Sequence, residues 1–410
     1  MQPGRNAGQF DPVAFRALFP TQAFDSAVYL DNAATTLTPA SVVETLTHYY
    51  THARSTAGRS AYRRAAQTTQ SIEAVRTSLM QLLRCPPDYV LVFCPGATAA
   101  INMVAWTIPF QHGDNVVVTV LEHHANLLPW WRCRAHGVTV RVAPTHPDGR
   151  LDVADVVRLF DQRTRLMAVT HMSNVLGMVP PVAELCAAAR RRDILSLVDG
   201  TQALGHLSVD LAELGCDIYV ASAHKAYGPT GVGLLALSPR ALEILQPPIL
   251  GGGAVAQISG DTFTLQAPPH GWEAGTPPIA EILGWGASLP VLQRATSSDA
   301  QAYVAELTEA LVSQLHALPA VTVYGAMPAA DRYGTVSFNV DPLSPHRVAA
   351  LLDEMYGVMV RSGEHCASLT CREVLGVSQG TVRVSLAPYN TPQDIATLVE
   401  GVRWVAQALH

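Results

Sequence analysis

Asp217-Ile-Tyr-Val-Ala-Ser-Ala-His-Lys-Ala-Tyr-Gly-Pro-Thr-Gly231 joins an apolar run to a turn that carries a lysine. The run, residues 218–221, is typical of a short buried strand. It stops at Ser222, and Lys225 follows just before a turn rich in glycine and proline. Ligands of open α/β sheets bind where the strands end. By position alone, Lys225 is either a solvated loop lysine or an amine that forms a Schiff base with a carbonyl compound.

A second apolar run lies upstream at residues 194–198, and it ends in Asp199. Enzymes that use pyridoxal phosphate (PLP) need a lysine for the cofactor's aldehyde and an acid for its pyridinium nitrogen. The acid keeps that nitrogen protonated, and the charged ring then accepts electrons from a carbanion. Because Lys225 and Asp199 each follow a buried strand, together they predict a PLP site.

Length and composition limit the class of protein. The chain has 410 residues, 49% hydrophobic and 15% charged, which suits two domains or one large domain with an appendage. The net charge of −6 gives no signal for binding polyanions, so no nucleic acid partner is expected. Seven cysteines without a CxxC pair indicate reduced thiols, and no metal site is expected.

Neither secretion nor insertion in a membrane is expected from the sequence. No apolar run reaches the length of a membrane span, so no membrane partner is expected. Residues 1–9 lack the apolar core of a signal peptide. We therefore expect a cytoplasmic protein.

Strand and helix patterns alternate along the first part of the chain, which predicts an α/β fold with a mostly parallel sheet covered by helices. Beyond the polar residues 295–299 this order changes, and a smaller α+β domain is expected. We therefore divide the chain into a large PLP-binding domain, residues 29–294, and a small domain made of residues 1–28 and 295–410. The strands expected before residue 295 are 28–30, 89–93, 115–120, 138–142, 165–170, 194–198 and 218–221.

Proline and glycine mark several helix boundaries. Thr38-Pro39 is expected to supply the N-cap and first residue of a helix that runs to about Tyr50. Ser344-Pro345 is expected to begin a helix that ends at Gly357. Thr391-Pro392 is expected to start the last helix.

Other strand ends carry polar candidates. The turn at residues 94–98 opens a helix, and the free N–H groups there, with the hydroxyl of Thr98, favour a phosphate. Many strand-to-helix turns look alike, so this signal alone is weak. His123 is either an ordinary histidine or an imidazole that stacks on the PLP ring and shuttles protons. Asn174 can offer its amide to a ring hydroxyl or to a substrate carboxylate.

Cys366 lies in a polar segment, residues 362–366, and at least partial exposure is expected. It is either an inert loop cysteine or a nucleophile. A thiol reacts as the thiolate, so nearby positive charge must lower its pKa, and Arg361 and His365 are the candidates.

Arg383 belongs to a strand in which it alternates with two valines, Val382 and Val384. Since alternate residues face opposite sides of a strand, inward valines place Arg383 on the other face. It makes either a structural ion pair or a bidentate clamp on the carboxylate of an amino acid.

Several stretches together resemble one family, the PLP-dependent cysteine desulfurases of the Suf/Csd type within the class V aminotransferase group. They occur in the family's order and cover roughly residues 28–409. The lysine motif alone indicates the broad group, whereas the Cys366 motif with Arg383 is more specific. The matching stretches are Tyr29–Ala34, Glu122–Asn126, Ser173–Gly177, Val198–Gln202, Ser222–Gly231, Glu273–Pro277, Arg361–Ala367 and Arg383–Asn390.

The resemblance implies a fold-type I PLP transferase and a role for each matching residue. Lys225 would hold PLP as a Schiff base, and Asp199 would pair with the pyridinium. His123 would stack on the ring, and Gln202 would bond the ring hydroxyl. The residues implied at the phosphate are Ala97, Thr98, Ser222, His224 and, from the partner subunit of a homodimer, Thr276.

The resemblance also implies the substrate and the reaction. Arg383 and Asn174 would hold the carboxylate of L-cysteine, and Lys225 or His123 would move its Cα proton. The Cys366 thiolate would attack the substrate sulfur and keep it as a persulfide, and L-alanine would leave. An acceptor protein of the SufE type, or a thiol, would then take the sulfur.

Two other functions remain open from the sequence. A related PLP lyase or aminotransferase acting on another amino acid, such as selenocysteine, would not need Cys366. A non-catalytic scaffold that binds a sulfur-carrier protein would not need bound PLP, although Lys225 and Asp199 argue against it.

The chain departs from the family pattern on the cofactor side. It has Gly96-Ala97-Thr98-Ala99 where Gly-Thr-Thr-Glu is usual, so one hydroxyl near the phosphate is missing. Gly58 stands where a histidine commonly precedes Arg59, which puts a role of Arg59 in the partner's active site in doubt.

The thiol segment departs as well. Glu364 adds a negative charge that should oppose thiolate formation at Cys366. The segment from Cys366 to Arg383 is about two residues longer than usual, and Ser368-Leu-Thr-Cys371 replaces a proline-containing run. Cys371 is either a second reactive thiol or a packing residue, and we expect packing.

Overall fold

The computed structural model describes residues 10–20, 27–58, 60–146, 148–325, 328 and 331–407, and within them the chain builds a seven-stranded central sheet. The strand order is β2-β8-β7-β6-β5-β3-β4. Neighbours from β4 to β7 are parallel, and β8 is antiparallel to both β7 and β2. The expected mostly parallel sheet is therefore confirmed. Its strands are β2 (Val90–Cys94), β3 (Asn115–Thr119), β4 (Thr139–Ala143), β5 (Thr164–Thr170), β6 (Leu195–Asp199), β7 (Ile218–Ser222) and β8 (Gly233–Leu237).

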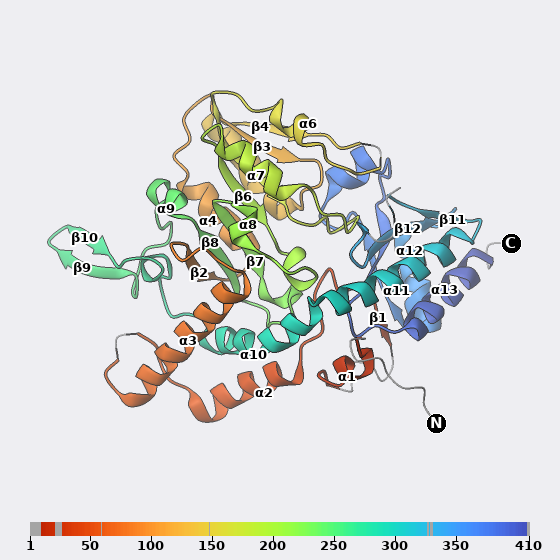
Figure 1. The fold of residues 1–410 in the computed structure, drawn as a ribbon, viewed down its shortest axis with the longest axis horizontal. Coiled ribbons are helices and arrows are strands. Elements are labelled where there is room, and N and C mark those ends of the chain that lie inside the picture. Colours follow the sequence, from red (N-terminus) through yellow and green to blue (C-terminus); the bar gives the residue numbers. More distant parts are fainter. Residues whose placement is uncertain are drawn as a thin grey trace.

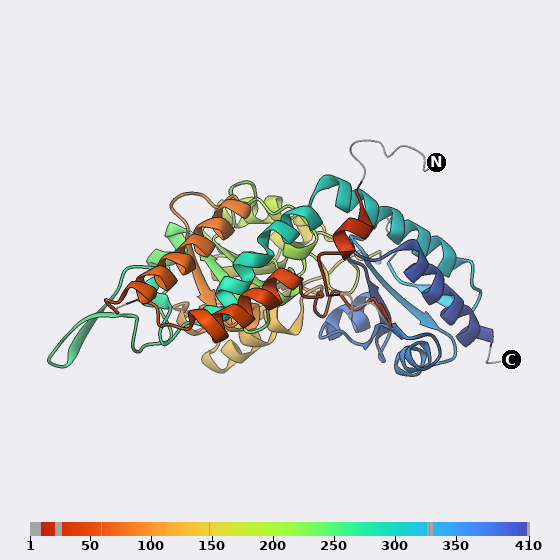
Figure 2. The ribbon, with the colours of Figure 1, turned by 90° about the horizontal axis from the view of Figure 1, so that it is seen from below.

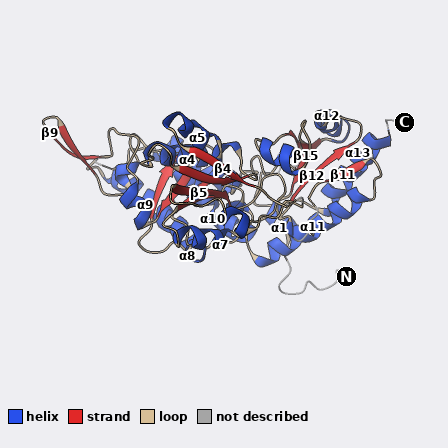
Figure 3. Ribbon diagram, turned by 90° about the horizontal axis from the view of Figure 1, so that it is seen from above, coloured by secondary structure: helices blue, strands red, loops and turns tan. Residues whose placement is uncertain are grey.

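Helices cover both faces of this sheet, as Figure 3 shows. One face carries α4 (Ala97–Thr107) and α5 (Leu128–Arg132), and the other carries α7 (Val182–Arg190), α8 (Leu211–Leu214) and α10 (Ile279–Ala295). Successive side chains of a strand point to opposite faces, so Val116 packs into one core and Val117 into the other. Burial on both faces explains why these strands are almost continuously apolar in the sequence.

Two helices from the start of the chain, α2 (Ala40–His48) and α3 (Arg63–Leu82), pack against α10 (Figure 2). The expectation that Thr38 caps α2 is wrong. Pro39 is the N-cap, and no side chain caps the helix. Instead, the N–H of Ala40 donates to the carbonyl of Leu18 at 2.9 Å, so a tertiary contact sets where the helix begins.

A hairpin of β9 (Val255–Ser259) and β10 (Thr262–Leu265) projects from the body of the molecule in Figures 1 and 2. Its side chains are largely exposed, and they include Ile258 and Phe263. The sequence pattern does not predict this hairpin, because strands with no buried face lack the usual alternation of polar and apolar residues.

A second, antiparallel sheet has the order β11-β12-β15-β14 and packs with three helices at the end that holds the C-terminus (Figure 1). The N-cap Ser344 accepts from the N–H of Arg347, and Gly357 ends the helix at φ 62°, as expected. This α+β arrangement matches the expectation, and the domain division at residue 294 stays a prediction. The elements are α11 (Ser298–His316), β11 (Val321–Val323), β12 (Thr335–Val340), α12 (Pro345–Tyr356), β14 (Arg361–Gly363), β15 (Thr381–Ser385) and α13 (Pro392–Gln407).

The N-terminal region joins this second part. Strand β1 (Val28–Tyr29) pairs in parallel with β13 (Val358–Met359), and α1 (Pro12–Arg16) precedes it. Asp11 caps α1 by accepting from two backbone N–H groups. Among the described residues, no helix has both the length and the apolar character needed to cross a membrane.

Candidate active site

A cavity of about 350 Å³ lies where β5, β6 and β7 end. The loops after β3 and β14, the start of α4, and β15 complete its wall, so both sheets contribute to it. The amine, the acid, the thiol and the arginine singled out in the sequence all line this one cavity. The predicted residues that line it are Ala97, Thr98, His123, Asn174, Asp199, Gln202, Ser222, His224, Lys225, Cys366 and Arg383.

Lys225 ends the single turn of helix that follows β7 and is the only lysine in the sequence. Burial, followed by the positive charge of Arg383, lowers the pKa of Lys225 to about 8. The negative charge of Asp199 opposes this shift without cancelling it. A lysine amine must be neutral to attack an aldehyde, so the lowered pKa suits Schiff base formation near neutral pH.

Asp199 is the last residue of β6, in register with Val220 of the neighbouring β7. This pairing of parallel strands brings the acid to the same edge as Lys225. Burial raises the pKa of Asp199, and its Oδ1 accepts from the N–H of Thr201 at 3.0 Å. A cation beside a buried carboxylate favours its ionised form, so a protonated pyridine ring fits this position.

The turn before α4 fits a phosphate. Gly96 is the N-cap with φ 153°, in the region that favours glycine, and no side chain caps the helix. The N–H of Ala97 donates to Oγ of Ser222 at 2.9 Å. An uncapped start of an eleven-residue helix offers free N–H groups and the positive end of the dipole to an anion. Thr98, Ser222 and His224 line the same cavity.

His123 is held as a neutral imidazole. Burial, followed by the charge of Lys225, lowers its pKa to about 3. Its Nδ1 accepts from the N–H of Ala125 at 3.0 Å, so in the neutral ring Nε2 carries the proton. His123 therefore suits stacking on a cationic ring better than it suits the role of a strong base.

Arg383 is almost completely buried, at 3% exposure. Its Nη2 donates to Oδ1 of Asp31 at 2.8 Å, and its Nη1 donates to the carbonyl of Asn174 at 3.1 Å. Its Nε is buried and has no hydrogen-bond partner among the described residues. Val382 and Val384 pack in the core of the second sheet, so the expected orientation of Arg383 is confirmed. Arg383 lines the cavity, so its positive charge fits an anionic ligand there.

The two predicted amide side chains are oriented by backbone carbonyls. Nδ2 of Asn174 donates to the carbonyl of His365 at 2.8 Å. Nε2 of Gln202 donates to the carbonyl of Ala33 at 2.8 Å. Both side chains also line the cavity, so each is fixed in orientation before any ligand arrives.

Asp31 is a site residue that the sequence reasoning missed. It forms the ion pair with Arg383, and the negative charge of Asp31 is one of the influences that raise the pKa of Lys225. Asp31 closely follows β1, the same kind of strand-end position that identified Asp199. Applying that rule to every predicted strand would have found it.

Cys366 is exposed, as expected, and lies in the loop after β14. The expectation that His365 supplies positive charge is wrong. Burial, followed by the charge of Arg383, lowers the pKa of His365 to about 2, so its ring is neutral. Arg361 also lines the cavity and remains as the cationic candidate. The carboxylate of Glu364 accepts from Nε of Arg372 at 2.7 Å, which offsets the charge that Glu364 adds.

Cys371 is fully buried, and its Sγ donates to the carbonyl of Glu364 at 3.6 Å. Burial raises the pKa of this thiol to about 12. The expectation that Cys371 is a packing residue is confirmed.

Thr276, which the resemblance assigns to the partner subunit's site, does not line the cavity that contains Lys225. Thr276 lines a separate cavity of about 820 Å³ that also includes Gly58 and Arg76. Arg59 lies outside the described residues. A role for Thr276 in a partner's site stays a prediction.

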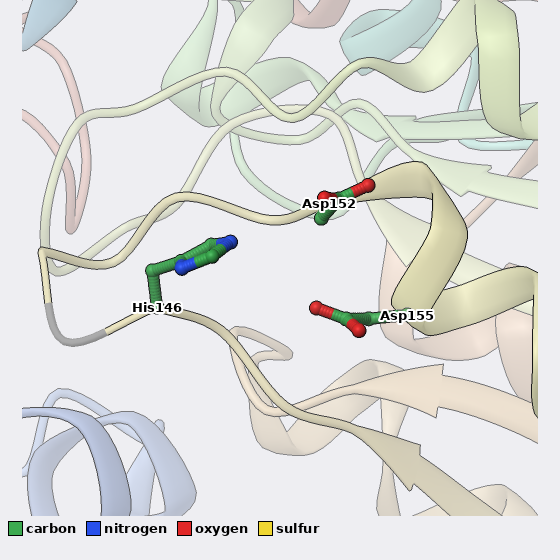
Figure 4. Close-up of side chains that lie close together, drawn as sticks. All are labelled: His146, Asp152 and Asp155. Atoms are coloured by element: carbon green, nitrogen blue, oxygen red, sulfur yellow. The ribbon is translucent and has the colours of Figure 1, made fainter.

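His146, Asp152 and Asp155 bring three possible metal ligands within 4.8 Å of one another, and Figure 4 shows them around one gap at the start of α6 (Val153–Val157). Both carboxylates already have partners. Asp152 caps the helix through the N–H of Ala154, and Asp155 pairs with Arg158. We assign no cation to this exposed group, and the expectation of no metal site stays a prediction.

Known proteins resemble the chain over nearly its whole length. The family model "Aminotransferase class-V" matches residues 28–398. A cysteine desulfurase of Pectobacterium atrosepticum is 39% identical over 404 residues, which cover 96% of this chain and 98% of that protein. The apo structure of the cysteine desulfurase of Thermococcus onnurineus NA1 aligns with a TM-score of 0.91 and 32% identity, covering 98% of this chain and 100% of that one. The cysteine desulfurase CsdA of Escherichia coli, in an S-sulfonic acid form, aligns with a TM-score of 0.88 and 35% identity, covering 98% and 99%.

Proposed function

The chain belongs to the class-V aminotransferase family and, within it, to the PLP-dependent cysteine desulfurases of fold-type I, and on this premise we propose how its residues convert L-cysteine to L-alanine. The observation that carries the assignment of roles is that Lys225, Asp199, Arg383 and Cys366 line one cavity. The amine and the acid come from the large sheet, and the other two from the second part of the chain.

The cavity fits PLP through the contacts described above. Lys225 would bind its aldehyde, Asp199 its ring nitrogen and Gln202 its ring hydroxyl. The start of α4, with Ser222 and His224, would hold the phosphate. When bound, PLP supplies an electron sink for charge that develops on the amino acid.

Arg383 would bind the carboxylate of L-cysteine. Asp31 and the carbonyl of Asn174 hold the two Nη atoms of the guanidinium, and Arg383 lines the cavity. Asn174 lies beside it, with one amide hydrogen committed to His365. A charge-assisted contact in a buried site is strong and directional, so it would set which face of the substrate meets Lys225.

Lys225 is the better candidate for moving the Cα proton. A general base works best when its pKa is near the operating pH. The pKa of Lys225 is about 8, whereas that of His123 is about 3 and its Nδ1 is already engaged. We therefore assign proton transfer to Lys225 and ring stacking to His123.

Cys366 would take the sulfur. Its thiolate attacks the substrate Sγ, an S–S bond forms, and the Cβ–S bond breaks. The electron pair of the broken bond stays on the substrate, which gains a proton and leaves as L-alanine. The products are then L-alanine and one persulfide on Cys366, so atoms and electrons balance without an added oxidant.

We also propose an oligomeric state, a sulfur acceptor and a cellular compartment for the protein. The exposed hairpin residues Ile258 and Phe263, and the place of Thr276 outside the Lys225 cavity, support a homodimer. Exposure of Cys366 supports transfer to an acceptor protein of the SufE type. All seven cysteines are unpaired, which supports a reducing, cytoplasmic setting.

Mass spectrometry of the protein after incubation with L-cysteine tests this proposal. We expect one added sulfur on Cys366, removable by a reductant, and L-alanine in solution. Cys366→Ser should retain PLP and lose both products, and Cys371→Ser, at the buried thiol of the same loop, should retain both. Alanine formation by Cys366→Ser at the rate of the unaltered enzyme would instead indicate a lyase, and selenocysteine would be the next substrate to assay.

A further inference from the structure

The backbone of the Cys366 loop has a conformation that needs support from outside. His365 and Cys366 both have positive φ, at 53° and 55°. Side chains with a Cβ seldom adopt this region, and two in succession persist only where surrounding contacts hold them.

The segment after β3 supplies the contacts. The N–H of His124 donates to the carbonyl of Cys366 at 2.6 Å. The imidazole Nε2 of His124 accepts from the N–H of Ser368 at 3.3 Å, and Oγ of Ser368 lies 2.9 Å from the same nitrogen. A backbone N–H can only donate, so Nε2 is the acceptor and the Ser368 hydroxyl donates to it as well.

A second contact lies two residues further along the chain. Oγ1 of Thr370 donates to the carbonyl of Val120 at 3.0 Å. Ser368 and Thr370 both belong to the run that replaces a proline-containing stretch in this chain. The longer loop is therefore fastened by side chains that it brings itself.

The same short segment also carries His123, which lines the cofactor side of the cavity. His123 and His124 are adjacent, so the ring contact and the loop contact are linked through one peptide bond. Any shift of these contacts between His124 and the Cys366 loop would change the distance between the thiol and a substrate bound beside Lys225.

We propose that His124 and Ser368 are positioning residues, a clasp that holds the Cys366 loop to the end of β3 and sets the place of its thiol for sulfur transfer. This rests on the proposed function. The clasp touches neither the cofactor nor the substrate carboxylate contacts, so it governs the transfer of sulfur and leaves binding unchanged.

The test compares the PLP-loaded enzyme with Ser368→Ala, Ser368→Thr and His124→Phe. His136→Phe is the matched control, because His136 is an exposed histidine on the nearby η4 turn (Cys133–His136). We expect single-turnover persulfide formation to fall roughly three- to tenfold in Ser368→Ala and His124→Phe, about the effect of one or two lost hydrogen bonds. Ser368→Thr keeps the hydroxyl and should restore the rate. The cofactor absorbance, and its change on adding L-cysteine, should stay as in the unaltered enzyme.

Unchanged persulfide formation in both Ser368→Ala and His124→Phe overturns the clasp. So does a loss of cofactor absorbance that matches the loss of transfer, since the residues would then support the fold in general. Failure of Ser368→Thr to restore the rate removes Ser368 from the proposal. If the unaltered enzyme itself forms no persulfide, the proposed function fails, which is a separate result.

Discussion

The two sides of the active site are held in different ways. On one side, Lys225 and Asp199 follow neighbouring strands, and the register of β6 and β7 places them. On the other side, Cys366 lies in a loop whose strained backbone is held by contacts with residues more than 240 positions earlier, such as the 244-residue separation between His124 and Ser368. The amine is fixed by the sheet, and the thiol is fixed by a few backbone and side-chain hydrogen bonds to a distant segment.

Because the amine and the thiol are held in different ways, different mutations would displace them. Moving Lys225 would require a change in strand register, which would turn buried residues outward along the whole strand. Moving Cys366 requires only the loss of a few hydrogen bonds between its loop and the segment after β3. Changes on the sheet side should therefore affect binding and stability, and changes on the loop side should affect sulfur transfer.

The largest expected effect is at Lys225. Lys225→Ala should lower alanine formation by at least about 10²- to 10⁴-fold, because it removes both the Schiff base and the proton-transfer group. The amount of L-alanine released measures the loss of activity. Borohydride reduction followed by peptide mapping checks the site of the Schiff base. Because the sequence has one lysine, PLP should be fixed to the peptide with Lys225 and to no other side chain. Lys225→Arg is the control that keeps the charge, and a label on a different side chain would contradict the assignment.

The second largest expected effect is a loss of stability when the buried ion pair of Arg76 and Glu273 is broken. Arg76 is 5% exposed and donates through Nη1 and Nη2 to Glu273, whose Oε1 also accepts from the N–H of Phe93 in β2. Arg76→Met leaves Glu273 without its cation, so the free energy of unfolding in urea should fall by about 3–5 kcal/mol.

The matched control for this prediction is Arg84→Met. Arg84 pairs with Asp210 at 3.1 Å, but its side chain is 65% exposed. Its loss should cost about 0–1 kcal/mol. Equal losses of stability in the two variants would show that the buried pair is not an anchor of the sheet side.

The smallest effect is the pH dependence of cofactor binding. Burial lowers the pKa of Lys225 to about 8, and only the neutral amine attacks the aldehyde. The rate at which the apoenzyme takes up PLP should rise roughly tenfold from about pH 7 to about pH 9 and then level off. Stopped-flow absorbance measures it, with N-acetyl-lysine amide as the control whose rate continues to rise. A protein rate that rises in parallel with this control would mean that the amine is solvated.

Local patterns predicted the sheet side well. Apolar runs and the residues after them gave β6 and β7 with Asp199 and Lys225, because both signals lie within one short stretch. Proline and glycine likewise gave α12 its ends at Ser344 and Gly357. These features depend on neighbours in the sequence, so the sequence alone carries them.

Distant contacts were beyond the same reasoning. The cap of α2 was misplaced because the carbonyl of Leu18 binds Ala40. The neutral state of His365 follows from its burial, which the loop composition does not reveal. The pairing of Asp31 with Arg383 spans 352 positions and exists only once both sheets have met. Such pairs follow from tertiary packing.

The complete burial of Cys371 affects the fate of the sulfur that Cys366 is proposed to accept. All seven cysteines lie in the described part of the chain, and the one that shares the loop with Cys366 is buried and remains protonated. Cys371 therefore offers no thiolate that could attack the proposed persulfide on Cys366 and form a disulfide within the chain. In the proposed reaction, the transferred sulfur would therefore stay on the exposed Cys366 until a nucleophile from solvent removes it.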